Sequence, residues 1–100
     1  MPKIEEKLEV QEKSTSECFQ ACLSLVDTIG YKLFKKRDIA NLIICNEKLD
    51  GQKIDLSITV PFGSPTTINL NLSSDNLDQS ALQAEADRIS EVLLANLTAN

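Results

Sequence analysis

Two segments in the second half of the chain alternate between apolar and polar residues. In residues 53–60 and 66–72, every second residue is aliphatic over most of the segment. Such a period of two predicts strands that present one face to a core and the other to water. The Asp50-Gly51 pair and the proline-flanked segment 61–65 predict the turns beside these strands. The aliphatic positions are Ile54, Leu56, Ile58, Val60, Ile68, Leu70 and Leu72.

Residues 3–11 and 39–45 are predicted as two further strands. In residues 3–11, Ile4, Leu8 and Val10 share one parity, although Glu6 breaks the alternation and the same spacing also suits a helix. Residues 39–45 are rich in β-branched side chains, but both of their faces are mostly apolar. The inward-facing set therefore stays open: it is either Ile39, Ile43 and Cys45, or Ala40, Leu42 and Ile44.

Two segments show the helical period. Ser14 and Glu17 have the spacing of a capping box, and apolar residues follow at helical spacing up to Ile29. Gly30 then suits the position just past a helix end, which gives a helix of about 15 residues. A second helix of about 20 residues is predicted near the end of the chain, with Asp75 or Asp78 as its cap. Its apolar stripe is Leu82, Ala86, Ile89, Val92, Leu93 and Leu97, and Gln83, Glu85, Asp87, Arg88 and Glu91 are placed largely off that stripe.

These elements predict an α+β fold in the order β-α-β-β-β-α. Strands joined by short turns pair antiparallel, and two helices are about as wide as four strands. We therefore expect a two-layer sandwich in which both helices pack on one face of the sheet. A chain of 100 residues fits a single domain spanning residues 1–100.

The strand predicted at residues 39–45 leaves an apolar strip on the polar side of the sheet, whichever parity it adopts. A symmetric second copy is the simplest cover. Alternatively, the N-terminal strand, the short extended or turn segment 31–34 or the curvature of the sheet covers the strip. The candidate partner-binding residues are Ala40, Leu42 and Ile44, together with Phe62 at a hairpin tip. Phe62 is either exposed there as a partner contact or packed back on the sheet edge.

Charge and cysteine content exclude several classes of function. The net charge of −5 argues against nucleic-acid binding, and no apolar stretch approaches the length of a membrane span. The basic cluster of Lys32, Lys35, Lys36 and Arg37 is interpreted as a solvated loop, with a local contact to an anion or a partner as the alternative. The three cysteines and the absence of a secretory signal at the N-terminus predict a cytoplasmic protein with free, buried thiols.

No set of residues predicts catalysis. The sequence contains no histidine, no glycine-rich phosphate loop and no metal-ligand spacing. The paired carboxylates fall mostly on predicted solvent faces, whereas general acid–base catalysis needs a carboxylate in a dry cleft. We therefore expect no enzyme, no cofactor and no metal.

Two stretches resemble known domains. Residues 4–19, a strand followed by a Ser-x-x-x-x-Phe helix start, resemble the opening of Bet v 1-like (START-related, helix-grip) domains. Residues 16–22, continuing to the Gly-Tyr pair at 30–31, look like small bacterial domains of unknown function with an α-β-β-β-α core. The helix-grip resemblance implies a curved sheet around a long C-terminal helix, often with an apolar ligand cavity between them. This chain departs from it by lacking the strands that form the far wall of that cavity, which leaves only the packing scheme. No catalytic residue is carried over, because no matching catalytic motif is present.

The sequence therefore predicts a small, non-enzymatic interaction domain that binds a protein partner, or itself as a homodimer, through the open sheet face. Two alternatives remain from other classes. One is a carrier of a small hydrophobic molecule or lipid between the sheet and the last helix. The other is an acidic, secretion-chaperone-like adaptor.

Overall fold

The computed structural model describes residues 3–10, 13–49, 51–63 and 66–98, and it contains both helices and strands. The elements follow one another in the order β-α-β-β-β-β-α. They are β1 (Lys3–Val10), α1 (Thr15–Leu25), β2 (Lys32–Arg37), β3 (Leu42–Leu49), β4 (Gln52–Thr59), β5 (Thr66–Ser73) and α2 (Gln79–Thr98).

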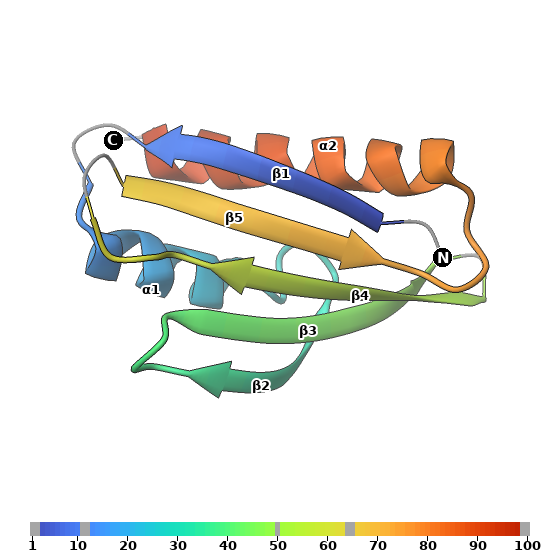
Figure 1. Ribbon diagram of the computed structural model, residues 1–100, viewed down its shortest axis with the longest axis horizontal. Helices are drawn as coiled ribbons and strands as arrows, with labels where there is room; N and C mark the ends of the chain where they lie inside the picture. Colours follow the sequence, from blue (N-terminus) through green and yellow to red (C-terminus); the bar gives the residue numbers. More distant parts are fainter. Residues whose placement is uncertain (1–2, 11–12, 50, 64–65, 99–100) are drawn as a thin grey trace.

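The strands form one antiparallel sheet in the order β1-β5-β4-β3-β2. Both helices lie behind the same face of this sheet, with α2 behind β1 and β5 and α1 behind the middle strands (Figure 1). The predicted α+β sandwich with helices on one face is therefore confirmed. The other side of the sheet, here called the open face, has no helix in front of it.

The sheet contains one more described strand than the sequence predicted. The basic cluster was interpreted as a solvated loop, which is wrong, because residues 32–37 form the edge strand β2. All six residues of β2 are exposed, so this strand has no buried parity that would leave an alternating pattern in the sequence. The predicted order β-α-β-β-β-α accordingly gains a strand between α1 and β3.

The strand predicted at residues 39–45 begins later and runs further than expected. Residues 38–41 form the turn between β2 and β3, and the strand itself spans Leu42–Leu49. Asn41 adopts a positive φ of 48°, and its Nδ2 donates a 3.1 Å hydrogen bond to the carbonyl oxygen of Val60. Ile39 is 94% exposed in this turn, so its predicted place in the sheet is wrong.

The start of the first helix matches its prediction, and its end is closed by a specific turn. The Glu17 amide donates to Ser14 Oγ at 3.1 Å and the Ser14 amide to Glu17 Oε1 at 2.9 Å, which completes the capping box. The regular helix ends at Leu25, before the predicted end at Ile29. The Tyr31 amide then bonds to the Val26 carbonyl and the Gly30 amide to the Asp27 carbonyl. These two bonds form a Schellman motif around Gly30, whose φ is +90°.

The second helix has the predicted length of 20 residues. Of the two candidate caps, Asp78 is the one in place, since its Oδ1 accepts from the Ala81 amide at 2.8 Å. The stripe of α2 packs on the inner sides of β1 and β5, where the buried side chains leave little exposed surface. The fully buried or nearly fully buried residues of these layers are Ile4, Val10, Ile68, Leu70, Leu72, Leu82, Ala86, Ile89, Leu93 and Leu97.

The first strand is confirmed over Lys3–Val10, and the alternative of a helix there is wrong; Gln11 and the turn residue Asp50 lie outside the described residues. Glu6 faces inward with the apolar residues of β1, as its pairing with Leu70 requires. Its carboxylate lies at the margin of the core and accepts a 2.7 Å hydrogen bond from Nε2 of Gln83 on α2. This hydrogen bond offsets part of the free-energy cost of removing the Glu6 carboxylate from water.

Candidate functional site

Cross-strand pairing fixes which side of β3 each residue occupies. Ile43 pairs with Ile58 and Cys45 with Leu56, and all four side chains are buried on the helix side. The parity left open by the sequence is thereby settled, because Leu42 and Ile44 must lie on the open face. Leu42 and Ile44 are both half-buried.

The neighbours of these two side chains are polar. Leu42 lies between Arg37 of β2 and Thr59 of β4, while Ile44 lies between Lys35 and Ser57. Further along the same rows come Asn69 and Asn71 of β5. The expected apolar strip on a polar face therefore exists, and it consists of two residues.

A shallow depression of about 300 Å³ adjoins Ile44 on this face. Its walls include Ser57 of β4, Asn71 of β5 and Glu5 of β1, so it crosses three strands beyond β3. Of the two residues of the strip, Ile44 therefore lies at the edge of a concave surface.

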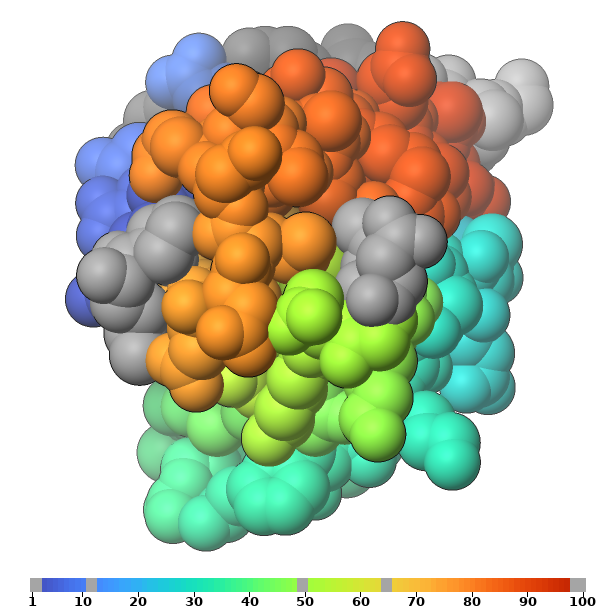
Figure 2. Space-filling model, turned by 90° about the vertical axis from the view of Figure 1, so that its right-hand side faces the viewer, coloured from blue at the N-terminus to red at the C-terminus, as the bar shows by residue number. Residues whose placement is uncertain are grey.

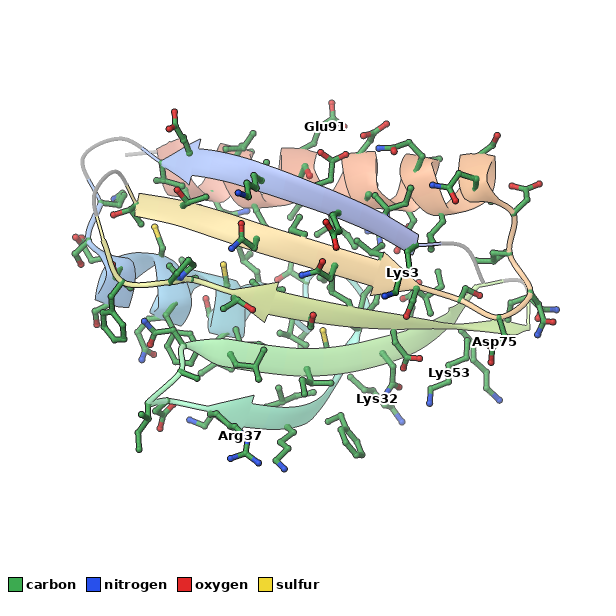
Figure 3. All side chains as sticks on the ribbon, in the orientation of Figure 1. Lys3, Lys32, Arg37, Lys53, Asp75 and Glu91 are labelled. Carbon is green, nitrogen blue, oxygen red and sulfur yellow. The ribbon has the colours of Figure 1, made fainter. Side chains whose placement is uncertain are left out.

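The open face is positively charged although the chain as a whole is acidic. Its described positions carry an excess of four positive charges, whereas the net charge of the chain is −5. The rest of the chain therefore carries an excess of nine negative charges. Figure 3 looks onto this face and shows Lys3, Lys32 and Lys53 towards one end and Arg37 along β2. The cations are Lys3, Lys7, Lys32, Lys35, Arg37, Lys48 and Lys53, and the anions are Glu5, Glu9 and Asp55.

The other two candidate residues lie at one end of the sheet rather than on its face. Ala40 is exposed in the turn between β2 and β3, and Phe62, 74% exposed, follows the end of β4. Paired hydrogen bonds between Asn41 and Val60 hold these two loops side by side. The structure thus brings Ala40 near the Phe62 loop, and the exposed Ile39 joins them there.

Sequence reasoning missed a polar cluster in which the buried Tyr31 and Glu85 meet the exposed Arg88. The Tyr31 hydroxyl donates to Glu85 Oε2 at 2.8 Å. Arg88 donates from Nε to Glu85 Oε1 at 2.9 Å and from Nη2 to Oε2 at 2.7 Å, and Nη2 also reaches the Ile29 carbonyl at 2.8 Å. Glu85 is only 6% exposed, so its predicted place off the apolar stripe is wrong. Its position three residues after Leu82 and four before Ile89 was the available signal.

The ionisation of this cluster follows from its contacts. Burial alone would raise the pKa of Glu85, but the hydrogen bonds from Arg88 and Tyr31 outweigh it and hold that pKa below its usual value. Burial and the bond to Glu85 raise the pKa of Tyr31, so its hydroxyl remains a donor. Burial, followed by the charge of Glu85, raises the pKa of the nearby Glu47. The cluster ties α2 to the Schellman turn after α1, which is a structural role.

The cysteines lie in the core. Cys18, Cys22 and Cys45 are free and buried, as predicted. Burial raises the pKa of Cys22 and of Cys45 to about 12, so both thiols stay protonated near neutral pH. Within the described ranges, no group of three or more cysteine or carboxylate residues is placed to hold a metal ion. No described helix combines the length and the apolar character needed to cross a membrane.

No family model matches the sequence, and no curated protein matches it with statistical significance.

Proposed function

We propose that this protein is a non-enzymatic interaction domain that binds a protein partner through the open face of its sheet. The proposal is carried by Leu42 and Ile44, two aliphatic side chains that remain partly exposed among polar residues. Covering the exposed part of two such side chains would contribute roughly 2–3 kcal/mol to binding. The depression beside Ile44 offers a partner side chain a place to insert.

The charge of the open face supports an acidic partner. A surface with an excess of four positive charges attracts a partner of opposite sign and accelerates its association. Two copies meeting face to face would oppose two such surfaces, so charge disfavours the homodimer. An acidic segment of another protein is the occupant that fits both the aliphatic strip and the surrounding cations.

The alternatives receive less support. Packed side chains of α2, β1 and β5 occupy the space in which a hydrophobic ligand of a carrier would lie. The buried groups of Tyr31 and Glu85 bond to each other, and the exposed Arg88 bonds to Glu85, which favours a structural over a catalytic role. A relationship to Bet v 1-like domains stays a proposal, supported by the long C-terminal helix behind the sheet.

Methyl NMR spectra test the proposed face. The probe is an amphipathic helical peptide of leucine and glutamate, and its control replaces each glutamate with lysine. We expect the glutamate peptide to shift the methyl resonances of Leu42 and Ile44, whereas Ile43, which is buried on the same strand, serves as the internal reference. The lysine peptide should cause no such shifts.

Substitution supplies the second arm of the test. The double variant Leu42→Thr, Ile44→Thr removes apolar surface while keeping side chains that suit a strand, and it should weaken binding about tenfold or more. Ile39→Thr, at the exposed turn, is the matched control and should bind like the parent. Light scattering at low salt should show a monomer. If the parent is instead a dimer and the double variant is a monomer, the partner on this face is a second copy rather than an acidic segment.

A further inference from the structure

The two edges of the sheet differ in how they are covered. At one edge, α2 packs behind β1, Gln79 donates a 3.0 Å hydrogen bond to the Lys3 carbonyl, and Gln83 bonds to Glu6. At the other edge, neither helix lies behind β2 (Figure 1). Figure 2 shows β2, in teal, at the bottom of the molecule, far from the orange and red of α2. The edge of β2 is therefore open on its outer side.

The composition of β2 is unusual for an open edge. Four of its six residues are cationic, and the remaining two, Leu33 and Phe34, are 47% and 73% exposed. The pairing register with β3 shifts between Leu33 and Lys35, which leaves Phe34 in a bulge. Lysines and bulges on an edge strand discourage pairing with other edges. They do not explain why two large apolar side chains are exposed beside them.

Pairing also distributes these side chains over the two sides of the sheet. Lys32, Lys35 and Arg37 pair with open-face residues of β3, whereas Leu33 and Lys36 pair with the buried Cys45 and Ile43. An added strand would thus meet cations on one side. On the other side it would meet Leu33 and Lys36.

We propose that the outer edge of β2 binds an extended acidic peptide segment of another protein, which adds to the sheet as a further strand. The unpaired backbone groups of an edge strand supply the hydrogen bonds for such strand addition, and side chains supply the specificity. The four cations select acidic residues in the segment, and Leu33 and Phe34 accept its apolar side chains. This surface shares Lys32, Lys35 and Arg37 with the open face, but the backbone pairing along its edge is a different contact and does not depend on the proposed function.

The charge of β2 also disfavours pairing between the β2 edges of two copies. Two β2 edges brought together would each present four cations to the other. Pairing of β2 with β1 of another copy would join the molecules head to tail into an open chain. In that arrangement β1 would present Lys3 and Lys7 beside its glutamates. An acidic foreign strand avoids both costs.

The first experiment is an NMR titration of the full chain with a capped peptide as long as β2 in which glutamate and valine alternate. We expect backbone amide shifts concentrated in β2 and β3, with an affinity that falls as salt is added. The same peptide with lysine in place of glutamate should not bind. The variant Lys35→Glu, Arg37→Glu should weaken binding about tenfold or more. Its matched control, Lys3→Glu, Lys7→Glu on β1, changes the net charge equally and should bind within about twofold of the parent.

A second experiment tests backbone pairing without altering the protein. Alternate amides of an added strand point towards the sheet. Of two glutamate–valine peptides N-methylated at alternate positions, the one methylated on the paired amides should lose binding, and the other should retain it. This readout separates strand addition from binding on the open face.

Several results would overturn the inference. If the two methylated peptides both bind, or both fail to bind, backbone pairing is excluded. Equal weakening by the β1 and β2 variants would show a response to net charge alone. Tighter binding of a charge-matched oligothymidylate at β2 would assign the edge to nucleic acid. If the protein alone forms open-ended oligomers and the β2 variant does not, the occupant of the β2 edge is a second copy.

Discussion

The Tyr31 hydroxyl donates a 2.8 Å hydrogen bond to Oε2 of Glu85, although 54 positions separate the two residues. The bond joins the segment after α1 to the first half of α2. Arg88 completes the contact by holding both Glu85 and the Ile29 carbonyl. One buried carboxylate therefore helps to link the turn after α1 to α2.

Tyr31→Phe should destabilise the fold by about 1–3 kcal/mol, because it leaves buried Glu85 with one donor fewer. The melting temperature should fall by at least about 4 °C in a thermal unfolding experiment. Gln79→Ala removes an exposed hydrogen bond and is the control, with an expected change below about 0.5 kcal/mol. Equal effects of the two variants would contradict the role given to Tyr31.

Glu47→Gln should stabilise the protein near neutral pH. Burial and the charge of Glu85 raise the pKa of Glu47 in the folded state. A carboxyl with a raised pKa stabilises the fold while it is protonated, and this contribution is lost as the pH rises through its folded-state pKa. The urea midpoint of the variant should exceed that of the parent at about pH 7, and the difference should vanish near about pH 3.

The control for this pH dependence is Glu91→Gln. Glu91 is exposed on α2 and points away from the molecule (Figure 3). Its substitution should leave the urea midpoint nearly unchanged at both pH values. A gain equal to that of Glu47→Gln would point to overall charge as the cause.

Asn41→Gly and Asn41→Ala should separate two contributions to the turn after β2. Both variants lose the bond from Nδ2 to the Val60 carbonyl, which costs about 1 kcal/mol. Only alanine also pays the strain of a positive φ, about 1–2 kcal/mol more. Thermal unfolding should therefore rank the parent above the glycine variant and the glycine variant above the alanine variant, and the reverse order of the variants would refute this account.

The three cysteines should resist a thiol reagent in the folded protein. Cys18, Cys22 and Cys45 are buried, and burial raises the pKa of each thiol. Colorimetric titration should therefore detect three thiols per chain in denaturant and fewer than one without it. Rapid labelling of the folded protein would show that the core opens around α1.

The elements with a buried and an exposed side were predictable from the sequence. Residues 54–60 and 68–72 alternate because one parity meets the helices, and Ser14 with Glu17 marks a helix start through local bonds alone. The edge strand β2 was not predictable in this way, since no parity of it is buried. The cations that suggested a loop are those that an exposed edge tolerates.

The candidate surface was predicted in part for the same reason. Leu42 and Ile44 were expected to share the open face under one of the two parities, and pairing with Thr59 and Ser57 selects that parity. The positive charge of the face could not be counted without β2, which contributes three of its cations. The burial of Glu85 depends on Tyr31 and Arg88 reaching it, and such distant contacts leave no local pattern.

The pairing of β1 with β5 also constrains how the chain folds during synthesis. Residues 3–10 leave the ribosome well before the strand that they pair with, residues 66–73. Until then Ile4, Leu8 and Val10 have no sheet neighbour, whereas the hairpins from β2 to β5 close over short loops. Closing the long loop carries the larger entropy cost and slows folding. Among the described strands, nascent β1 is thus the one for which a chaperone would matter most.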